Sequence, residues 1–102
     1  MEVLFEDRKL QKLCTDEREM RKKRGDIADR LRLRVNALRT ATTVGELATI
    51  DPLGDWHQLH ENHAGKWAGK LSRNERLLVR PEGDSEPWDA VKVTVIDIDD
   101  YH

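Results

Sequence analysis

The chain has 102 residues, a length that fits one domain spanning residues 1–102, and its single cysteine makes an intrachain disulfide or a cysteine-based metal cage impossible. No apolar run is long enough to cross a bilayer, and the short acidic N-terminus does not resemble a signal peptide, so we expect a soluble, cytoplasmic protein. The net charge of −2 conceals a basic stretch between Trp56 and Arg80, which is more informative about partners than the total.

The N-terminal half predicts one short strand and two helices. Residues 3–5 form an apolar run that we interpret as an edge strand. A helix should begin after Asp7, with Thr15 and Asp16 as a stop or a fresh cap, and Gly25 should break it. A second helix, capped by Asp26, should extend to Thr40 because apolar residues repeat at helical spacing. These residues are Ile27, Leu31, Val35 and Leu38.

The second helix also carries several arginines around its polar arc. Arg30, Arg32, Arg34 and Arg39 are spread around the polar arc and accompanied by Asp26 and Asp29, so we interpret them as a solvated helix face. A direct duplex-DNA or RNA binder that uses these arginines remains an alternative.

The C-terminal half predicts antiparallel strands at 56–60, 66–71 and 75–80, followed by an acidic turn at 81–87. The last strand is rich in β-branched residues and is the best candidate for the middle of the sheet. Simple alternation would put Val91, Val93, Val95 and Asp97 on one side, and Lys92, Thr94, Ile96 and Ile98 on the other. The expected fold is α+β, with two N-terminal helices packed on a small, mainly antiparallel sheet.

Candidate chemistry concentrates at the C-terminus, where the last strand runs directly into Asp100, Tyr101 and His102. With His57 and Arg76, this set resembles the active site of a metal-free ribonuclease. Such an enzyme needs a base, a cation for the phosphate oxygens and an acid. A polar strand end is the competing interpretation. His57, His60 and His63 lack the geometry of a metal site, and no cofactor is expected. Cys14 lies on an apolar helix face and is expected in the core rather than as a nucleophile.

Several stretches together resemble the HigB-like, or plasmid maintenance killer, toxins of the RelE superfamily. The resemblance extends along nearly the whole chain, and the terminal Asp-Tyr-His is its most specific part. It rests on residues 8–14, the helix from Leu31 to Leu38, and the stretches 56–59, 64–67, 74–77 and 96–102.

The resemblance implies a RelE-like α+β toxin that enters the ribosomal A site and cleaves translated mRNA. By similarity, His57 and His102 would transfer protons, Asp100 would act as base or orienter, Tyr101 would contact a base, and Arg76 would stabilise phosphate charge. The implied partner is a HigA-like helix-turn-helix antitoxin, and operator DNA would be bound only through the toxin–antitoxin complex.

The chain departs from the family after the first histidine. Relatives usually have Lys-Gly-Asp-Arg where this sequence has His60-Glu61-Asn62-His63, which replaces two permanent cations by histidines. His60, Lys66, Lys70 and Arg73 are candidate RNA contacts, although ordinary surface charge is an equal alternative for the three permanent cations. The replacement also favours a rival: a weakly catalytic RelE-fold module that binds antitoxin and tunes operon repression. The ribonuclease hypothesis requires His57, Arg76 and the C-terminal triplet to meet in one cationic hollow.

Overall fold

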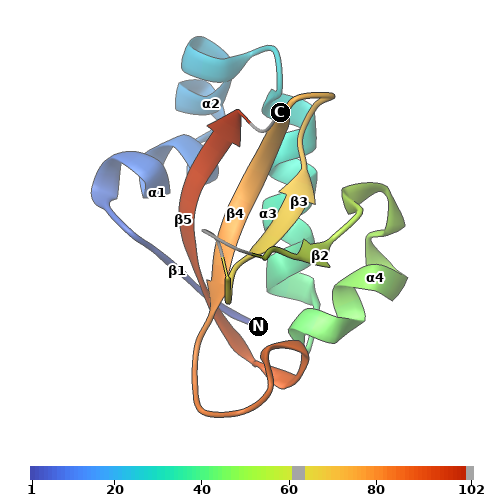
Figure 1. The fold of residues 1–102 in the computed structure, drawn as a ribbon. Helices are drawn as coiled ribbons and strands as arrows, with labels where there is room; N and C mark the ends of the chain where they lie inside the picture. The colour runs from blue at the N-terminus through green and yellow to red at the C-terminus, as the bar shows by residue number, and fades with distance from the viewer. Residues whose placement is uncertain (61–63, 101–102) are drawn as a thin grey trace.

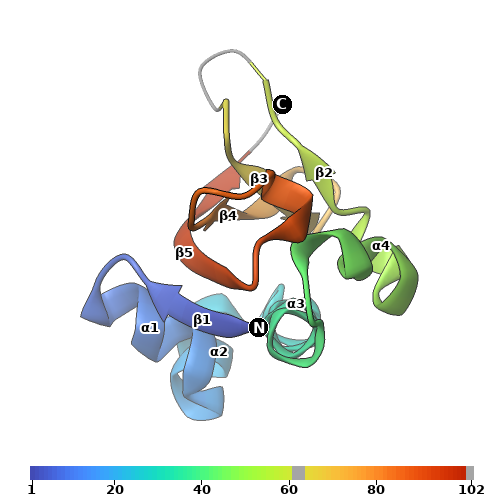
Figure 2. The same cartoon turned by 90° about the horizontal axis from the view of Figure 1, so that it is seen from below.

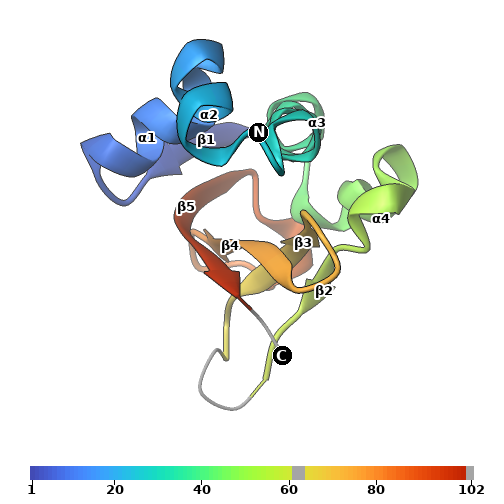
Figure 3. The same cartoon turned by 90° about the horizontal axis from the view of Figure 1, so that it is seen from above.

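The computed structural model describes residues 1–60 and 64–100 as one five-stranded sheet with three helices, α1, α2 and α3, against one face. Figure 1 shows the sheet from its uncovered side, and Figures 2 and 3 show these helices on the opposite side of β3, β4 and β5. The α+β prediction is therefore confirmed. In chain order the elements are β1 (Glu2–Phe5), α1 (Arg8–Thr15), α2 (Glu17–Arg24), α3 (Ala28–Thr40), η1 (Val44–Glu46), α4 (Leu47–Ile50), η2 (Pro52–Gly54), β2 (His57–Gln58), β3 (Trp67–Lys70), β4 (Glu75–Pro81), η4 (Pro87–Asp89) and β5 (Lys92–Asp100).

The N-terminal helical region contains three helices instead of the two that were predicted. Asp7 caps α1 by accepting a hydrogen bond from the Leu10 amide at 2.8 Å, as expected. Asp16 then separates α1 from α2 because its backbone is extended. Its amide donates to the Lys12 carbonyl, while its carboxylate accepts from the amides of Arg18 and Glu19. One residue thus ends one helix and caps the next.

The predicted apolar face of α3 is confirmed, but its predicted start is wrong. Ile27, Leu31, Val35 and Leu38 are all buried, with at most 2% of their surface exposed. The helix begins at Ala28, and Ile27 occupies the cap position without a side-chain hydrogen bond. Asp26 does not cap the helix because its carboxylate pairs with the Arg24 guanidinium at 3.2 Å.

The terminal strand lies inside the sheet, as predicted. The strand order is β1-β5-β4-β3-β2, with β1 parallel to β5 and the other neighbours antiparallel. Val93 and Val95 are completely buried. Val91, however, precedes the strand and is 60% exposed, so the strand begins one residue later than predicted.

A β-bulge changes which side chains of β5 face the helices. Leu78 pairs with Asp97 while the next residue, Val79, pairs with Val95, which leaves Ile96 as an extra residue in β5. Ile96 packs on Leu59, Ala68 and Leu78, whereas Ile98 packs against the main core. The prediction that Ile96 and Ile98 share a side is therefore wrong, because simple alternation does not survive an inserted residue.

The edge strand β2 is shorter than predicted, with two residues in place of five. Asp55 introduces it from a left-handed backbone conformation with φ of 46°, which turns the chain out of η2. The predicted strands at 66–71 and 75–80 correspond to β3 and β4.

Candidate functional site on the open face of the sheet

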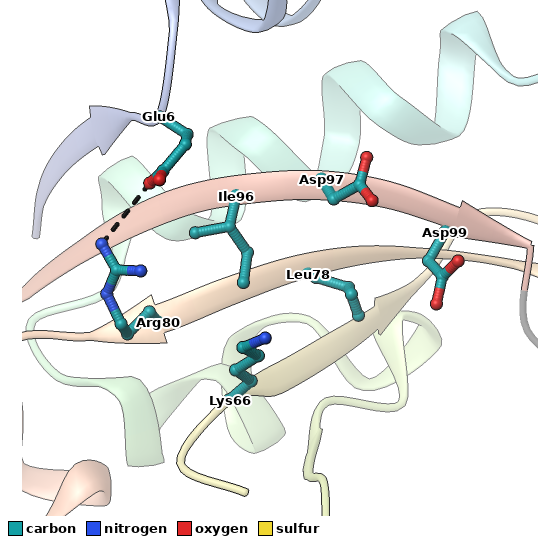
Figure 4. Close-up of a pocket in the computed structure, with 7 residues that line it drawn as sticks. All are labelled: Glu6, Lys66, Leu78, Arg80, Ile96, Asp97 and Asp99. Carbon is teal, nitrogen blue, oxygen red and sulfur yellow. Dashed lines mark hydrogen bonds and ion pairs between the residues drawn. The ribbon is translucent and has the colours of Figure 1, made fainter. Parts of the chain in front are cut away.

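The sheet face without helices carries a small apolar strip bordered by charges. Its buried residues are Leu59, Ala68 and Leu78, with Ile96 packed beside them. A groove of about 290 Å³ runs along this strip. Figure 4 shows the Lys66 side chain pointing toward Leu78 and Ile96. The groove is lined by Glu6, Lys66, Leu78, Arg80, Ile96, Asp97 and Asp99.

Strand register assigns His57 and Arg76 to this open face. His57 pairs with Ala68, and Ala68 pairs with Leu78, so the three side chains form one row across β2, β3 and β4. Arg76 lies two residues before Leu78 on the same strand and therefore on the same face. The register sets the Cα atoms of His57 and Arg76 roughly 12 Å apart, two strand spacings across and two residues along.

The His57 ring is oriented by the turn that precedes it. Its Nδ1 lies 2.8 Å from the Asp55 carbonyl oxygen. A carbonyl oxygen only accepts hydrogen bonds, so Nδ1 is the donor in this contact and Nε2 stays available to other partners.

A buried polar network that the sequence did not predict holds this turn in place. Arg34 is 4% exposed and donates to Asp51 at 3.0 Å, to the Lys70 carbonyl at 2.7 Å and to the Leu53 carbonyl at 3.0 Å. Asp51 also accepts the Trp56 indole N–H at 2.9 Å. The interpretation of Arg34 as a solvated surface residue is therefore wrong, because a distant carboxylate and two carbonyls satisfy its charge inside the protein.

Trp56, the residue before His57, packs directly on Gly54 and Gly69, and these contacts hold its indole in place. A Cβ on Gly54 would lie 2.5 Å from the Trp56 Nε1, and a Cβ on Gly69 would lie 2.6 Å from the indole ring. Only glycine leaves room for the ring at these positions. The indole, Asp51 and Arg34 together connect α3, α4, η2 and β3 to the start of β2.

Arg76 is bound to the backbone of the β3–β4 turn. Its Nη1 donates to the Ser72 carbonyl at 2.8 Å and to the Glu75 carbonyl at 3.0 Å. Its Nε is buried and has no hydrogen-bond partner among the described residues. These contacts restrict the guanidinium to the end of the open face.

The end of β5 divides its acidic residues between the two faces. Asp99 pairs with Arg76 and belongs to the open face, while Asp100 pairs with Glu75 in the adjoining row. Glu75 contacts Arg24 of α2, on the side of the helices. The predicted site residues Tyr101 and His102 lie outside the described residues, as does His63.

The expected RNA-contacting cations do not form one group. Lys66 lines the open-face groove, whereas Lys70 and Arg73 line a different pocket beside α3, together with Arg30 and Arg34. His60 is exposed just after β2. The candidate RNA contacts therefore lie on more than one surface of the described part of the chain.

The groove itself carries more acidic than basic groups. Glu6, Asp97 and Asp99 face Lys66 and Arg80. Arg80 donates to Glu82 at 2.9 Å, and this hydrogen bond raises the pKa of Arg80 and lowers the pKa of Glu82. Simple alternation did not place Asp97 and Asp99 in the groove, because their orientation follows from the bulge in β5.

Three other features concern the chain away from the groove. Burial raises the pKa of Cys14 to about 12, which makes the thiol a poor nucleophile and confirms its assignment to the core. Within residues 1–60 and 64–100, no three His, Cys, Asp or Glu side chains are grouped as metal ligands would be. None of the helices in the same residues combines the length and the hydrophobicity needed to span a membrane.

Comparison with known proteins identifies the fold. No protein-family model and no curated protein sequence matches the chain. Among solved structures, the chain is similar to a YoeB/ParE toxin from Agrobacterium tumefaciens, with a TM-score of 0.58 and 18% sequence identity. The match covers 100% of this chain and 99% of that one. The fold is therefore of the RelE/ParE-like type, as expected.

Proposed function

We propose that this protein is the toxin of a type II toxin–antitoxin system and acts as a ribosome-dependent mRNA endonuclease of the HigB-like type. The observation that carries the proposal is the common face of His57 and Arg76, onto which the last described strand also delivers Asp99. The end-to-end likeness to a YoeB/ParE toxin adds support. The sequence resemblance, with its terminal Asp-Tyr-His, supplies the remaining site residues.

The proposed reaction uses the RNA's own 2′-hydroxyl as nucleophile and needs no metal. A base removes the hydroxyl proton, O2′ attacks the adjacent phosphorus, and the bond from phosphorus to O5′ breaks. An acid then protonates O5′, which leaves a 2′,3′-cyclic phosphate and a 5′-hydroxyl. His57 and His102 transfer the protons, Tyr101 contacts a base, and Arg76 stabilises the charge on phosphate. Asp100, which pairs with Glu75 in the adjoining row, acts as orienter rather than as base.

The rest of the proposal concerns partners. Lys66, Lys70, Arg73 and His60 contact RNA on the ribosome, and a HigA-like helix-turn-helix antitoxin neutralises the toxin in the cytoplasm. Operator DNA is bound only through the complex of the two proteins. Because Lys66 lies apart from Lys70 and Arg73, these cations would contact separate RNA segments.

Induced expression in bacterial cells tests the enzymatic role. The wild type should arrest growth and produce mRNA fragments with 5′-hydroxyl ends, and both His57→Gln and His102→Ala should abolish these effects. Gln58→Ala is the matched control, since Gln58 neighbours His57 on the same short strand and has no proposed role. Equal arrest by the wild type and the two histidine variants, or a harmless wild type, would contradict the proposal.

A second candidate is a catalytically weak module that binds antitoxin and tunes operon repression. It is favoured by the surplus of carboxylates in the open-face groove and by the backbone contacts that already occupy Arg76 Nη1. If it is correct, a chain truncated after Asp99 should repress the operon with antitoxin as well as the full chain does. Loss of both toxicity and RNA cleavage in that truncation would favour the enzyme.

A further inference from the structure

A second groove lies on the side of the molecule formed by α3 and the α4–η2 segment. Three of its apolar side chains are unusually open to solvent: Leu33 is 50% exposed, Ile50 is 40% exposed and Leu53 is 79% exposed. Leu33 comes from α3, while Ile50 and Leu53 come from α4 and η2, and all three line one pocket of about 370 Å³. Apolar side chains exposed together at a concave surface are typical of a protein-binding site.

One end of this groove is basic. The apolar pocket adjoins a second pocket, of about 380 Å³, through shared lining by Leu33, Arg34 and Leu53. Arg30, Lys70 and Arg73 also line the second pocket, and no carboxylate does. In the described part of the chain, none of these three cations has an ion-pair partner, and all three residues are exposed.

Arg34 does not add to this free positive charge, although it lines both pockets. Its guanidinium is bound to Asp51 and to two carbonyls, so its charge is already compensated. The network also gives the groove a rigid floor, because it ties α3 to α4, η2 and β3. The groove is therefore a preformed surface with an apolar part and a positively charged end.

We propose that this surface, the α3–η2 groove, binds an acidic amphipathic helical segment of a partner protein. Apolar side chains on successive turns of the segment contact Leu33, Ile50 and Leu53, and carboxylates at one end pair with Arg30, Lys70 and Arg73. A protein fits better than RNA because the exposed apolar groups are aliphatic. Bases stack on aromatic rings, and no aromatic residue lines either pocket. The inference does not rest on the proposed nuclease activity, since the groove shares no lining residue with the open-face groove. Lys70 and Arg73 are also proposed RNA contacts, so binding of the segment should exclude RNA from these two cations.

Fluorescence anisotropy with a defined probe tests the proposal. The probe is a labelled helical peptide of about 16 residues, with leucines on one face at helical spacing and glutamates clustered at one end. A scrambled peptide of the same composition controls for net charge. The full-length protein should bind the probe more tightly than the scrambled peptide, and added salt should weaken the binding.

Two pairs of variants locate the binding site. Leu53→Asp and Arg30→Glu should each weaken probe binding by about tenfold or more. Val91→Asp and Arg18→Glu make the same changes at exposed positions outside the groove, and they should leave the affinity unchanged. All four positions are exposed, and urea unfolding verifies that each variant is folded.

Each alternative occupant gives a distinct result that overturns the proposal. Failure of the wild type to prefer the probe, or insensitivity to Leu53→Asp and Arg30→Glu, would exclude the acidic segment. Preferential binding of a single-stranded RNA that Arg30→Glu abolishes would assign the surface to nucleic acid. Sedimentation that shows self-association lost in Leu53→Asp would assign it to a second copy of the chain.

Discussion

The two faces of the sheet use adjacent residues of the same strands for different purposes. On the helix-covered face, Leu77, Val79, Val93 and Val95 are completely buried against residues from the helices. On the open face, Leu78 belongs to a cluster with only Leu59, Ala68 and Ile96, and charged side chains surround it. Burial of apolar area, the main stabilising contribution, is therefore concentrated on one face, which leaves the other available for binding or chemistry.

The two halves of β5 also differ from each other. The first half of β5 contains the buried Val93 and Val95 and lies between β1 and β4, while the second half, beyond the bulge, pairs with β4. Asp97 and Asp99 follow the bulge and face the groove. A bulge next to a groove is a common way to redirect side chains at functional sites.

The largest expected effect comes from the buried ion pair that supports β2. Arg34→Met should lower the free energy of unfolding by about 4 kcal/mol, because the Asp51 carboxylate, whose side chain is only 12% exposed, would lose its cationic partner. Urea unfolding measures the change. Arg32→Met on the exposed side of the same helix, where the contact with Asp29 is 3.8 Å long, should cost less than about 0.5 kcal/mol. Similar losses in the two variants would show that the network is not structural.

A smaller loss of unfolding free energy is expected when neighbouring leucines on the two sheet faces are truncated, and the size of the loss should differ between the faces. Leu77→Ala should cost about 3 kcal/mol, because the large core cannot collapse around the missing side chain. Leu78→Ala should cost about 2 kcal/mol or less, since its small cluster borders an open groove that water can enter. Both side chains are buried, at 0% and 3% exposed, so exposure alone predicts equal losses. Equal losses in urea unfolding would contradict the contrast between the faces.

The smallest expected effect is a pH dependence at the rim of the open face. The hydrogen bond from Arg80 lowers the pKa of Glu82, so the pair contributes stability above the ordinary glutamate pKa and loses it as the pH falls through the lowered value. Because the side chains are 45% and 30% exposed, the contribution should stay below about 1 kcal/mol. Arg80→Gln should therefore be less stable than the wild type at neutral pH and equally stable in acid. A difference that persists in acid would point to lost packing instead.

Local sequence pattern determined several elements of this protein. The helical repeat of Ile27, Leu31, Val35 and Leu38 identified the buried face of α3, and the β-branched run identified the inner strand. Residue type identified Asp7 as a cap and Thr15-Asp16 as a helix stop or a fresh cap, although the same argument failed at Asp26. These features depend on neighbours within a few residues, so periodicity and propensity are sufficient to predict them.

Only the tertiary structure decided the positions that depend on distant partners. Arg34 is buried because Asp51, which is 17 residues away, and the Lys70 carbonyl, which is 36 residues away, receive its hydrogen bonds. One extra residue in β5 moved Ile98 to the core and aligned Asp99 with Arg76. Likewise, nearby cations in the sequence separated into two surfaces. Local pattern specifies the buried face of a helix and the presence of a strand. Strand register, including the bulge in β5, and long-range pairing determine which side chains share a sheet face and what they contact.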